Sequence, residues 1–115
     1  MAPDKDRVYL QHIIDEINRI GLFLNNVSKE ELLSDDITES HYAIVRSLEI
    51  IGEAASKLSA DFKSAHTDIP WQIITGMRNK IIHEYMSIDY QVVWETIHND
   101  LPLLKSAVEA ILTKG

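Results

Sequence analysis

A guanidinium, an amide, an imidazole and a phenol stand close together in one short stretch of the sequence, at Arg78, Asn79, His83 and Tyr85. A guanidinium binds phosphate through a planar fork of N–H donors, and an imidazole is the side chain best suited to move a proton near neutral pH. Together they can act on a phosphodiester bond. The same spacing also fits ordinary residues at a surface or at the edge of a core.

The pattern around these residues predicts the element that positions them. Apolar side chains recur there at helical spacing, at Trp71, Ile74, Met77, Ile81 and Ile82. We expect a helix that has Pro70 in its first position and continues to Tyr85. Since each residue turns a helix by about 100°, Arg78, Asn79 and His83 would lie within an arc of about 140°, with Tyr85 back near the side of Arg78.

The rest of the chain predicts an all-α fold, an antiparallel helical bundle of four main helices plus a short helical turn. The first helix is expected to begin with Asp4 or Asp6 as its cap and to end near residues 25–26. A capping box at Ser28 and Glu31 predicts the short turn. The apolar stripe of the first helix consists of Val8, Leu10, Ile13, Ile14, Ile17, Ile20 and Leu24.

Start and stop signals divide the second half of the chain. The longest helix is expected from residues 34–36 to about Ala60, followed by a polar connection over residues 61–69. Asp89 can cap the last helix, which Pro102 interrupts. Either that helix kinks at Pro102, or Asp100 caps a new one, so the last helix is kinked or split.

Two features of the longest helix leave alternatives open. Arg46, Glu49 and Glu53 form a charged stripe, which is either a row of intrahelical salt bridges or part of a functional face. Gly52 in mid-helix costs about 1 kcal/mol relative to Ala. Such a glycine often permits the close approach of another helix, either inside the bundle or across a dimer.

Composition limits the classes of protein that this chain can form. Its 115 residues, of which 45% are hydrophobic, suit a single domain over residues 1–115 with one core. Cysteine is absent, which excludes disulfides and thiolate metal sites and fits a reducing compartment. The histidines outside the stretch, His12, His41, His66 and His98, have no recognised metal spacing and are expected at the surface or its boundary. We therefore expect no metal and no cofactor.

The charge of the chain bears on its partners. A formal net charge of -7 counts against broad nucleic-acid binding, because phosphate contacts need basic residues. Residues 70–86 nevertheless contain two basic residues and one acidic residue, and the acidic remainder suits a basic protein partner or serves solubility. The sequence contains no apolar signal region and no run of transmembrane length, so we expect a soluble cytoplasmic protein that does not bind a membrane.

Two stretches of the chain resemble one family. Residues 46–55, Arg-Ser-Leu-Glu-Ile-Ile-Gly-Glu-Ala-Ala, form the first, and residues 68–85, from Asp-Ile-Pro-Trp to His-Glu-Tyr, form the second. Val93-Trp94 and residues 100–102 follow in the expected order. The sequence resembles the HepT-like toxins of the HEPN superfamily, which are encoded beside the minimal nucleotidyltransferase MntA. The family motif, Arg, four residues, His, one residue, Tyr, is present in full.

This resemblance implies a fold, an activity and a partner. The fold would be an antiparallel helical bundle that forms a homodimer. The activity would be metal-independent RNA cleavage, with Arg78 and His83 as the catalytic residues and Asn79 beside them. The antitoxin, an MntA-like nucleotidyltransferase, would silence the toxin by transferring AMP from ATP onto Tyr85.

The chemistry of RNA cleavage adds a constraint on assembly. Cleavage through the 2′-hydroxyl needs a base, an acid and cationic support for the phosphorane, yet one chain supplies a single motif histidine. A two-fold dimer would supply two histidines and two arginines in one composite site. Two alternatives remain: a non-catalytic subunit that helps a nucleotidyltransferase bind or regulate its substrate, which the acidic charge favours, and a structural bundle without chemistry.

Overall fold

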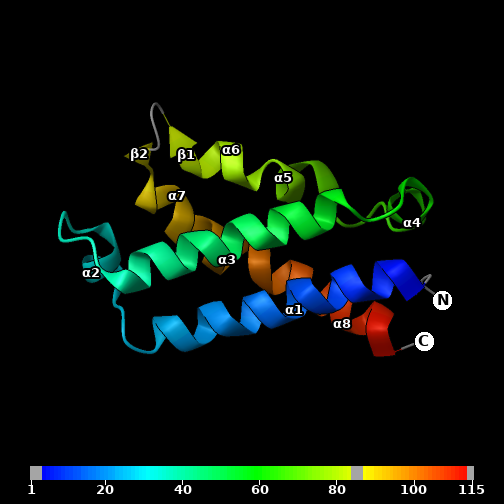
Figure 1. Ribbon diagram of the computed structural model, residues 1–115, viewed down its shortest axis with the longest axis horizontal. Helices are drawn as coiled ribbons and strands as arrows, with labels where there is room; N and C mark the ends of the chain where they lie inside the picture. Colours follow the sequence, from blue (N-terminus) through cyan, green and yellow to red (C-terminus); the bar gives the residue numbers. More distant parts are fainter. Residues whose placement is uncertain (1–3, 84–86, 114–115) are drawn as a thin grey trace.

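The computed structural model describes residues 4–83 and 87–113, and it is predominantly helical (Figure 1). Four antiparallel helical paths form the bundle: α1 (Asp4–Leu24), α3 (Glu39–Ser56), α5 (Trp71–Thr75) with α6 (Met77–Ile81), and α7 (Tyr90–Glu95) with η1 (Thr96–Asp100) and α8 (Leu101–Thr113). The short helices are α2 (Lys29–Leu33) and α4 (Ala60–Ala65). The predicted all-α bundle is confirmed.

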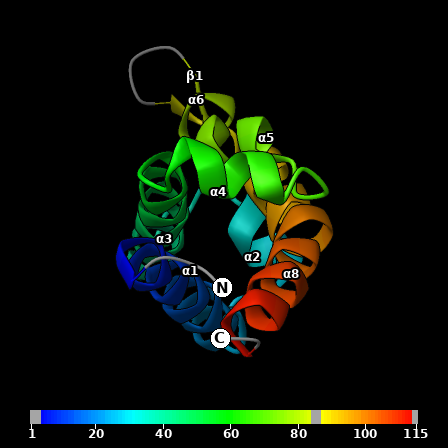
Figure 2. The ribbon, with the colours of Figure 1, turned by 90° about the vertical axis from the view of Figure 1, so that its right-hand side faces the viewer.

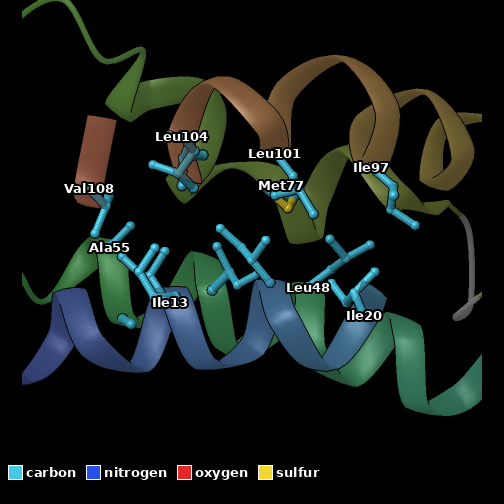
Figure 3. Packing of buried hydrophobic residues seen from close by; sticks show 14 of the residues in the cluster. Ile13, Ile20, Leu48, Ala55, Met77, Ile97, Leu101, Leu104 and Val108 are labelled. Carbon is cyan, nitrogen blue, oxygen red and sulfur yellow. The ribbon is translucent and has the colours of Figure 1, made fainter. Parts of the chain in front are cut away.

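The four paths are arranged around a common centre, as the end-on view in Figure 2 shows. Their buried side chains form one apolar core. Side chains from α1 and α3 face those from α6, η1 and α8 (Figure 3). The predicted stripe of α1 is largely confirmed, because Leu10, Ile13, Ile14, Ile17 and Ile20 are buried. Val8 is the exception, with 53% of its surface exposed. It lies five residues before Ile13, a spacing that places it on a different side of the helix.

The start of α1 uses its acidic residues differently from the prediction. The helix begins at Asp4, but the Asp6 carboxylate does not cap it. Asp6 is buried and accepts hydrogen bonds from the Ser59 backbone N–H (2.9 Å) and from Ser59 Oγ (2.7 Å). Ser59 Oγ in turn accepts from the Phe62 N–H at the start of α4. Asp6 therefore connects α1 to a helix more than fifty residues away in sequence.

The connection between α1 and α3 confirms one predicted cap and overturns two other predictions. Ser28 and Glu31 form the predicted capping box. However, α3 begins at Glu39 rather than at residues 34–36, and His41 is buried instead of lying at the surface. The His41 Nδ1 accepts from the Thr38 N–H (3.1 Å), and its Nε2 lies 3.1 Å from the carbonyl oxygens of Glu31 and Leu32. These bonds explain why an imidazole is stable in the core.

The end of α3 and the segment after it also differ from the prediction. The helix α3 ends at Ser56, with Lys57 as its C-cap, and does not reach Ala60. The expected polar connection over residues 61–69 contains α4, which places Phe62 in the core. Ser59 therefore caps the start of a new helix, α4, close to the position where the sequence pattern predicted the end of the long helix.

The last helical path accommodates Pro102 without a break. Asp89 caps α7 as predicted, because its Oδ1 accepts from the N–H groups of Gln91 and Val92 at 3.1 Å. The path then widens into the π-helical turn η1 and continues as α8 through Pro102. A π turn is a local distortion that absorbs the clash and the missing N–H of a proline. Asp100 lies in this turn and does not cap a separate helix, so the alternative in which Asp100 starts a new helix is wrong.

Candidate functional site

The helix expected from Pro70 to Tyr85 is not continuous. Pro70 is the N-cap of α5 rather than its first residue, and α5 ends at Thr75, with Gly76 as its C-cap. The Gly76 N–H donates to the Gln72 carbonyl at 3.0 Å, and α6 begins at the next residue. A Cβ at Gly76 would lie 3.0 Å from that same carbonyl oxygen, so the turn is tight. A glycine permits this close approach because it has no side chain.

The chain leaves the helical path at Ile82. Strand β1 (Ile82–His83) pairs antiparallel with β2 (Ser87–Ile88), with Ile82 opposite Ile88 and His83 opposite Ser87. The Asp89 N–H donates to the Ile81 carbonyl at 2.9 Å and closes the end of α6. His83 is therefore on a strand, and its predicted position on the same helical arc as Arg78 is wrong.

The predicted site residues are distributed over two elements. Arg78 and Asn79 are adjacent in α6, and His83 follows in β1. Asn79 is exposed. The side chains of Arg78 and His83, and the whole of Tyr85, lie outside the described part of the structure. The predicted position of Tyr85 near Arg78 therefore stays a prediction.

Core contacts and one ion pair anchor α6. Met77 and Ile81 are only 1% and 2% exposed, so one side of this short helix is fixed in the core. Lys80 Nζ lies 3.7 Å from the Asp100 carboxylate of η1, which connects α6 to the last helical path. The segment that carries Arg78 and Asn79 is thus held from two directions.

The contact of α3 with α5 decides the role of Gly52. A Cβ at this position would lie 3.2 Å from the Ile74 carbonyl oxygen, so the glycine permits a close approach within the chain. The charged stripe beside it lines an open hollow of about 250 Å³ together with Thr75. Glu53 forms an ion pair with Lys57 (3.3 Å), and Arg46 is exposed, with no ion pair among the described residues.

The remaining histidines differ in burial. His12 and His98 are exposed, as predicted, and His98 stacks on Trp94 at 3.9 Å between ring centroids. His66 is half-buried against Phe62. Within residues 4–83 and 87–113, no group of three or more histidine, aspartate or glutamate side chains could hold a metal ion. Among the helices of these residues, none combines the length and apolar character that a membrane span requires.

Two tyrosines that the sequence analysis did not single out flank the hairpin end of the bundle. Tyr42 of α3 and Tyr90 of α7 line an open pocket of about 550 Å³. Burial raises the pKa of the Tyr90 phenol above its ordinary value of 10.0, and the nearby Tyr42 raises it further. No sequence signal marks this pair, because the two residues belong to different helices, α3 and α7, and are 48 positions apart in the chain.

The helical bundle, with the Arg78 and His83 spacing on α6 and β1, has the features of the HEPN class. A family model described as "Ribonuclease HepT-like" matches residues 13–111, and the chain belongs to this family of ribonucleases. No solved structure matches the chain significantly.

Curated proteins support the same assignment. The chain is 42% identical to a "Putative RNase" of Caldanaerobacter subterraneus subsp. tengcongensis, over 94% of this chain and 95% of the relative. It is 40% identical to a "Probable ribonuclease HepT" of Thermococcus cleftensis, over 90% of this chain and 92% of the relative. It is 36% identical to a "Putative RNase" of Methanocaldococcus jannaschii, over 96% and 90%. These likenesses extend over nearly the whole chain in each case.

Proposed function

We propose that this chain is a metal-independent endoribonuclease, the toxin of a toxin–antitoxin pair, and that Arg78 and His83 carry its chemistry. The observation that carries the proposal is the complete spacing of Arg78, His83 and Tyr85 in a chain that matches the HepT-like ribonuclease family. Residues 1–115 act as one HepT-like domain in the cytoplasm, with RNA as the substrate.

The proposed residues divide the chemistry of cleavage between them. The RNA 2′-hydroxyl attacks the adjacent phosphorus, and the His83 imidazole moves a proton in this step. The Arg78 guanidinium stabilises the negative charge of the phosphorane. Asn79, which is exposed on α6, supports the phosphate through its amide N–H groups. The products are a 2′,3′-cyclic phosphate and a 5′-hydroxyl, because the 5′-oxygen leaves.

The active form is a homodimer with a composite site. The reaction needs both a base and an acid, and one chain supplies one motif histidine, so two copies of the α6–β1 segment meet across a two-fold axis. Gly52 does not support this assembly, since its close approach is to Ile74 of the same chain. Light scattering at micromolar concentration should give the mass of two chains, and a monomer would argue against a shared site.

Covalent modification of Tyr85 silences the toxin. The Tyr85 hydroxyl attacks the α-phosphorus of ATP in the active site of an MntA-like nucleotidyltransferase antitoxin, the phenol proton is lost and pyrophosphate leaves. The attached phosphate would compete for Arg78, and the nucleoside would obstruct RNA. After incubation with this partner, ATP and magnesium, the intact mass of the wild type should rise by one or more AMP units. The mass of Tyr85→Phe should stay unchanged.

A second candidate is a non-catalytic subunit that helps a nucleotidyltransferase bind or regulate its substrate. The net charge of -7 favours it, since an acidic chain attracts RNA weakly. Expression of the chain without a partner separates the two functions. A ribonuclease toxin should arrest growth, and the purified protein should cut RNA equally well with and without EDTA. Normal growth and intact RNA would support the second candidate.

A further inference from the structure

The hairpin end of the bundle contains a pocket that the proposed cleavage chemistry does not use. It lies between the α2–α3 connection, the first turn of α3, β2 and the start of α7, which lie at the same end of the molecule in Figure 1. We call it the tyrosine pocket, and its main lining residues are Leu33, Asp35, Ile37, Tyr42, Ile88 and Tyr90. Its volume of about 550 Å³ lies in the range of sites that bind small organic groups.

Polar and apolar surfaces contribute about equally to the walls of this pocket, and two tyrosine rings lie among them. Tyr42 is 65% exposed, and the rim residues Leu33 and Ile37 are 37% and 39% exposed. Among the described residues, neither Tyr42 nor Tyr90 forms a hydrogen bond through its hydroxyl. A phenol with an ordinary pKa of about 10 is uncharged at neutral pH, and burial raises the pKa of Tyr90 further. A flat, neutral group can therefore lie against these rings without competing with an existing contact.

The buried His41 holds one wall of the pocket in place. Its ring meets the Tyr90 ring edge-to-face, with centroids 4.9 Å apart and planes at 90°. Hydrogen bonds to Thr38 and to the carbonyls of Glu31 and Leu32 fix that imidazole. The Tyr90 side of the pocket is thus preorganised, which lowers the entropy cost of binding.

The charge of the pocket selects against phosphate. Asp35 is exposed and, within the described part of the chain, forms no ion pair. Its carboxylate repels a phosphate group but accepts hydrogen bonds from an amino group. A carboxylate also distinguishes bases, because adenine and cytosine carry an exocyclic amine and uracil does not.

The strand register connects the pocket to the proposed catalytic segment. Ile88 lines the pocket and is the β-ladder partner of Ile82, the residue before His83. Paired strands lie about 4.8 Å apart, so the pocket wall is next to the strand that carries His83. The pocket is thus beside the backbone of the proposed catalytic segment, so RNA bound at this segment can place an unpaired base in the pocket.

We propose that the tyrosine pocket binds an unpaired nucleobase with an exocyclic amino group, next to the phosphodiester that is cut. The base stacks on Tyr42 and Tyr90, and its amine donates to the Asp35 carboxylate. This inference rests on the proposed function in one respect: the base is supplied by single-stranded RNA. It adds a determinant of substrate selection that the Arg78 and His83 motif does not provide.

Binding of short RNAs tests the pocket separately from cleavage. Fluorescence anisotropy is measured with labelled hexanucleotides of A, C or U on His83→Ala protein. The A and C oligomers should bind several-fold more tightly than the U oligomer. Tyr42→Ala should weaken binding about tenfold, as expected for the loss of one stacking ring, and Tyr42→Phe should not. Asp35→Asn should remove the preference for A and C over U.

Tyr9→Ala is the matched control, because Tyr9 is a half-buried tyrosine of α1 outside the pocket. It should leave binding unchanged, with folding checked by circular dichroism. Unlabelled AMP distinguishes the source of the base: RNA should compete much better than AMP, and equal competition would assign the pocket to a mononucleotide instead. Unchanged binding in Tyr42→Ala, or no binding by the parent protein, would overturn the pocket. Absence of cleavage by the wild type with oligomer binding intact would instead contradict the proposed function alone.

Discussion

The pair α1 and α3 differs in build from the segment that runs from α5 to β2. Helices α1 and α3 are 21 and 18 residues long and lie side by side (Figure 1). Buried residues recur along the length of both helices. The second region consists of two five-residue helices separated at Gly76, followed by strands of two residues each. Long helices with one buried face gain stability from regular packing. The interrupted segment instead places Arg78, Asn79 and His83 on a short stretch that the bundle anchors at Met77 and Ile81.

The largest effect on stability is expected in the regular pair. Leu48 is fully buried in α3, at 0% exposure. Leu48→Ala should lower the free energy of unfolding by about 2–5 kcal/mol, because it removes buried apolar atoms and leaves a cavity. The matched control is Leu103→Ala, since Leu103 is 72% exposed on α8 and its truncation should change stability by no more than about 0.5 kcal/mol. Urea denaturation measures both, and equal effects would contradict the assigned core.

A smaller effect on stability is expected at the contact between α3 and α5, where the two regions meet. Gly52→Ala would place a Cβ 3.2 Å from the Ile74 carbonyl oxygen, so α5 must shift by a few tenths of an ångström. The substitution should destabilise the protein by about 1–3 kcal/mol, since overpacking outweighs the better helix propensity of alanine. It should also lower RNA cleavage, because α5 leads directly into α6. A Gly52→Ala protein that is more stable than the wild type would show that α3 and α5 are not tightly packed.

The smallest effect on stability is expected from Tyr90 at alkaline pH. The pKa of Tyr90 is raised in the folded protein, through burial and then through Tyr42, above its ordinary value of 10.0. The folded state therefore holds this proton more tightly than the unfolded state. Its stabilising contribution is complete below pH 10 and is lost as the pH rises through the folded pKa. Thermal unfolding should show a smaller loss of stability above pH 10 for Tyr90→Phe than for the wild type, and identical pH profiles would exclude this contribution.

The sequence predicts the two regions with different success for physical reasons. Apolar periodicity identifies α1 and α3, because each helix buries one continuous stripe. Local caps at Ser28 and Asp89 are also predictable, since their partners lie within three residues. The end of α6 cannot be predicted in this way, because the N–H that donates to the Ile81 carbonyl belongs to Asp89, which follows the β1–β2 hairpin.

Long-range contacts account for the other differences. Asp6 looks like a helix cap, but Ser59 binds it from a distant helix. His41 looks like a surface residue until the carbonyls of Glu31 and Leu32 are placed beside its ring. For the predicted site, helical geometry places His83 wrongly, because the chain leaves the helical path at Ile82. The tyrosine pocket has no sequence signature, because α3 and α7 create it only when the chain folds.

Cleavage of a single-stranded RNA by purified protein tests the central claim most directly. Wild type, His83→Ala and Arg78→Ala are compared with His12→Ala, a control that removes an exposed histidine of α1. The two motif variants should lose about 10²–10⁴ in rate, the range for one general acid or base, with unchanged helical circular dichroism. His12→Ala should cut at the wild-type rate and yield 2′,3′-cyclic phosphate ends. Cleavage by His83→Ala at the wild-type rate would contradict the assignment of the active site to this segment.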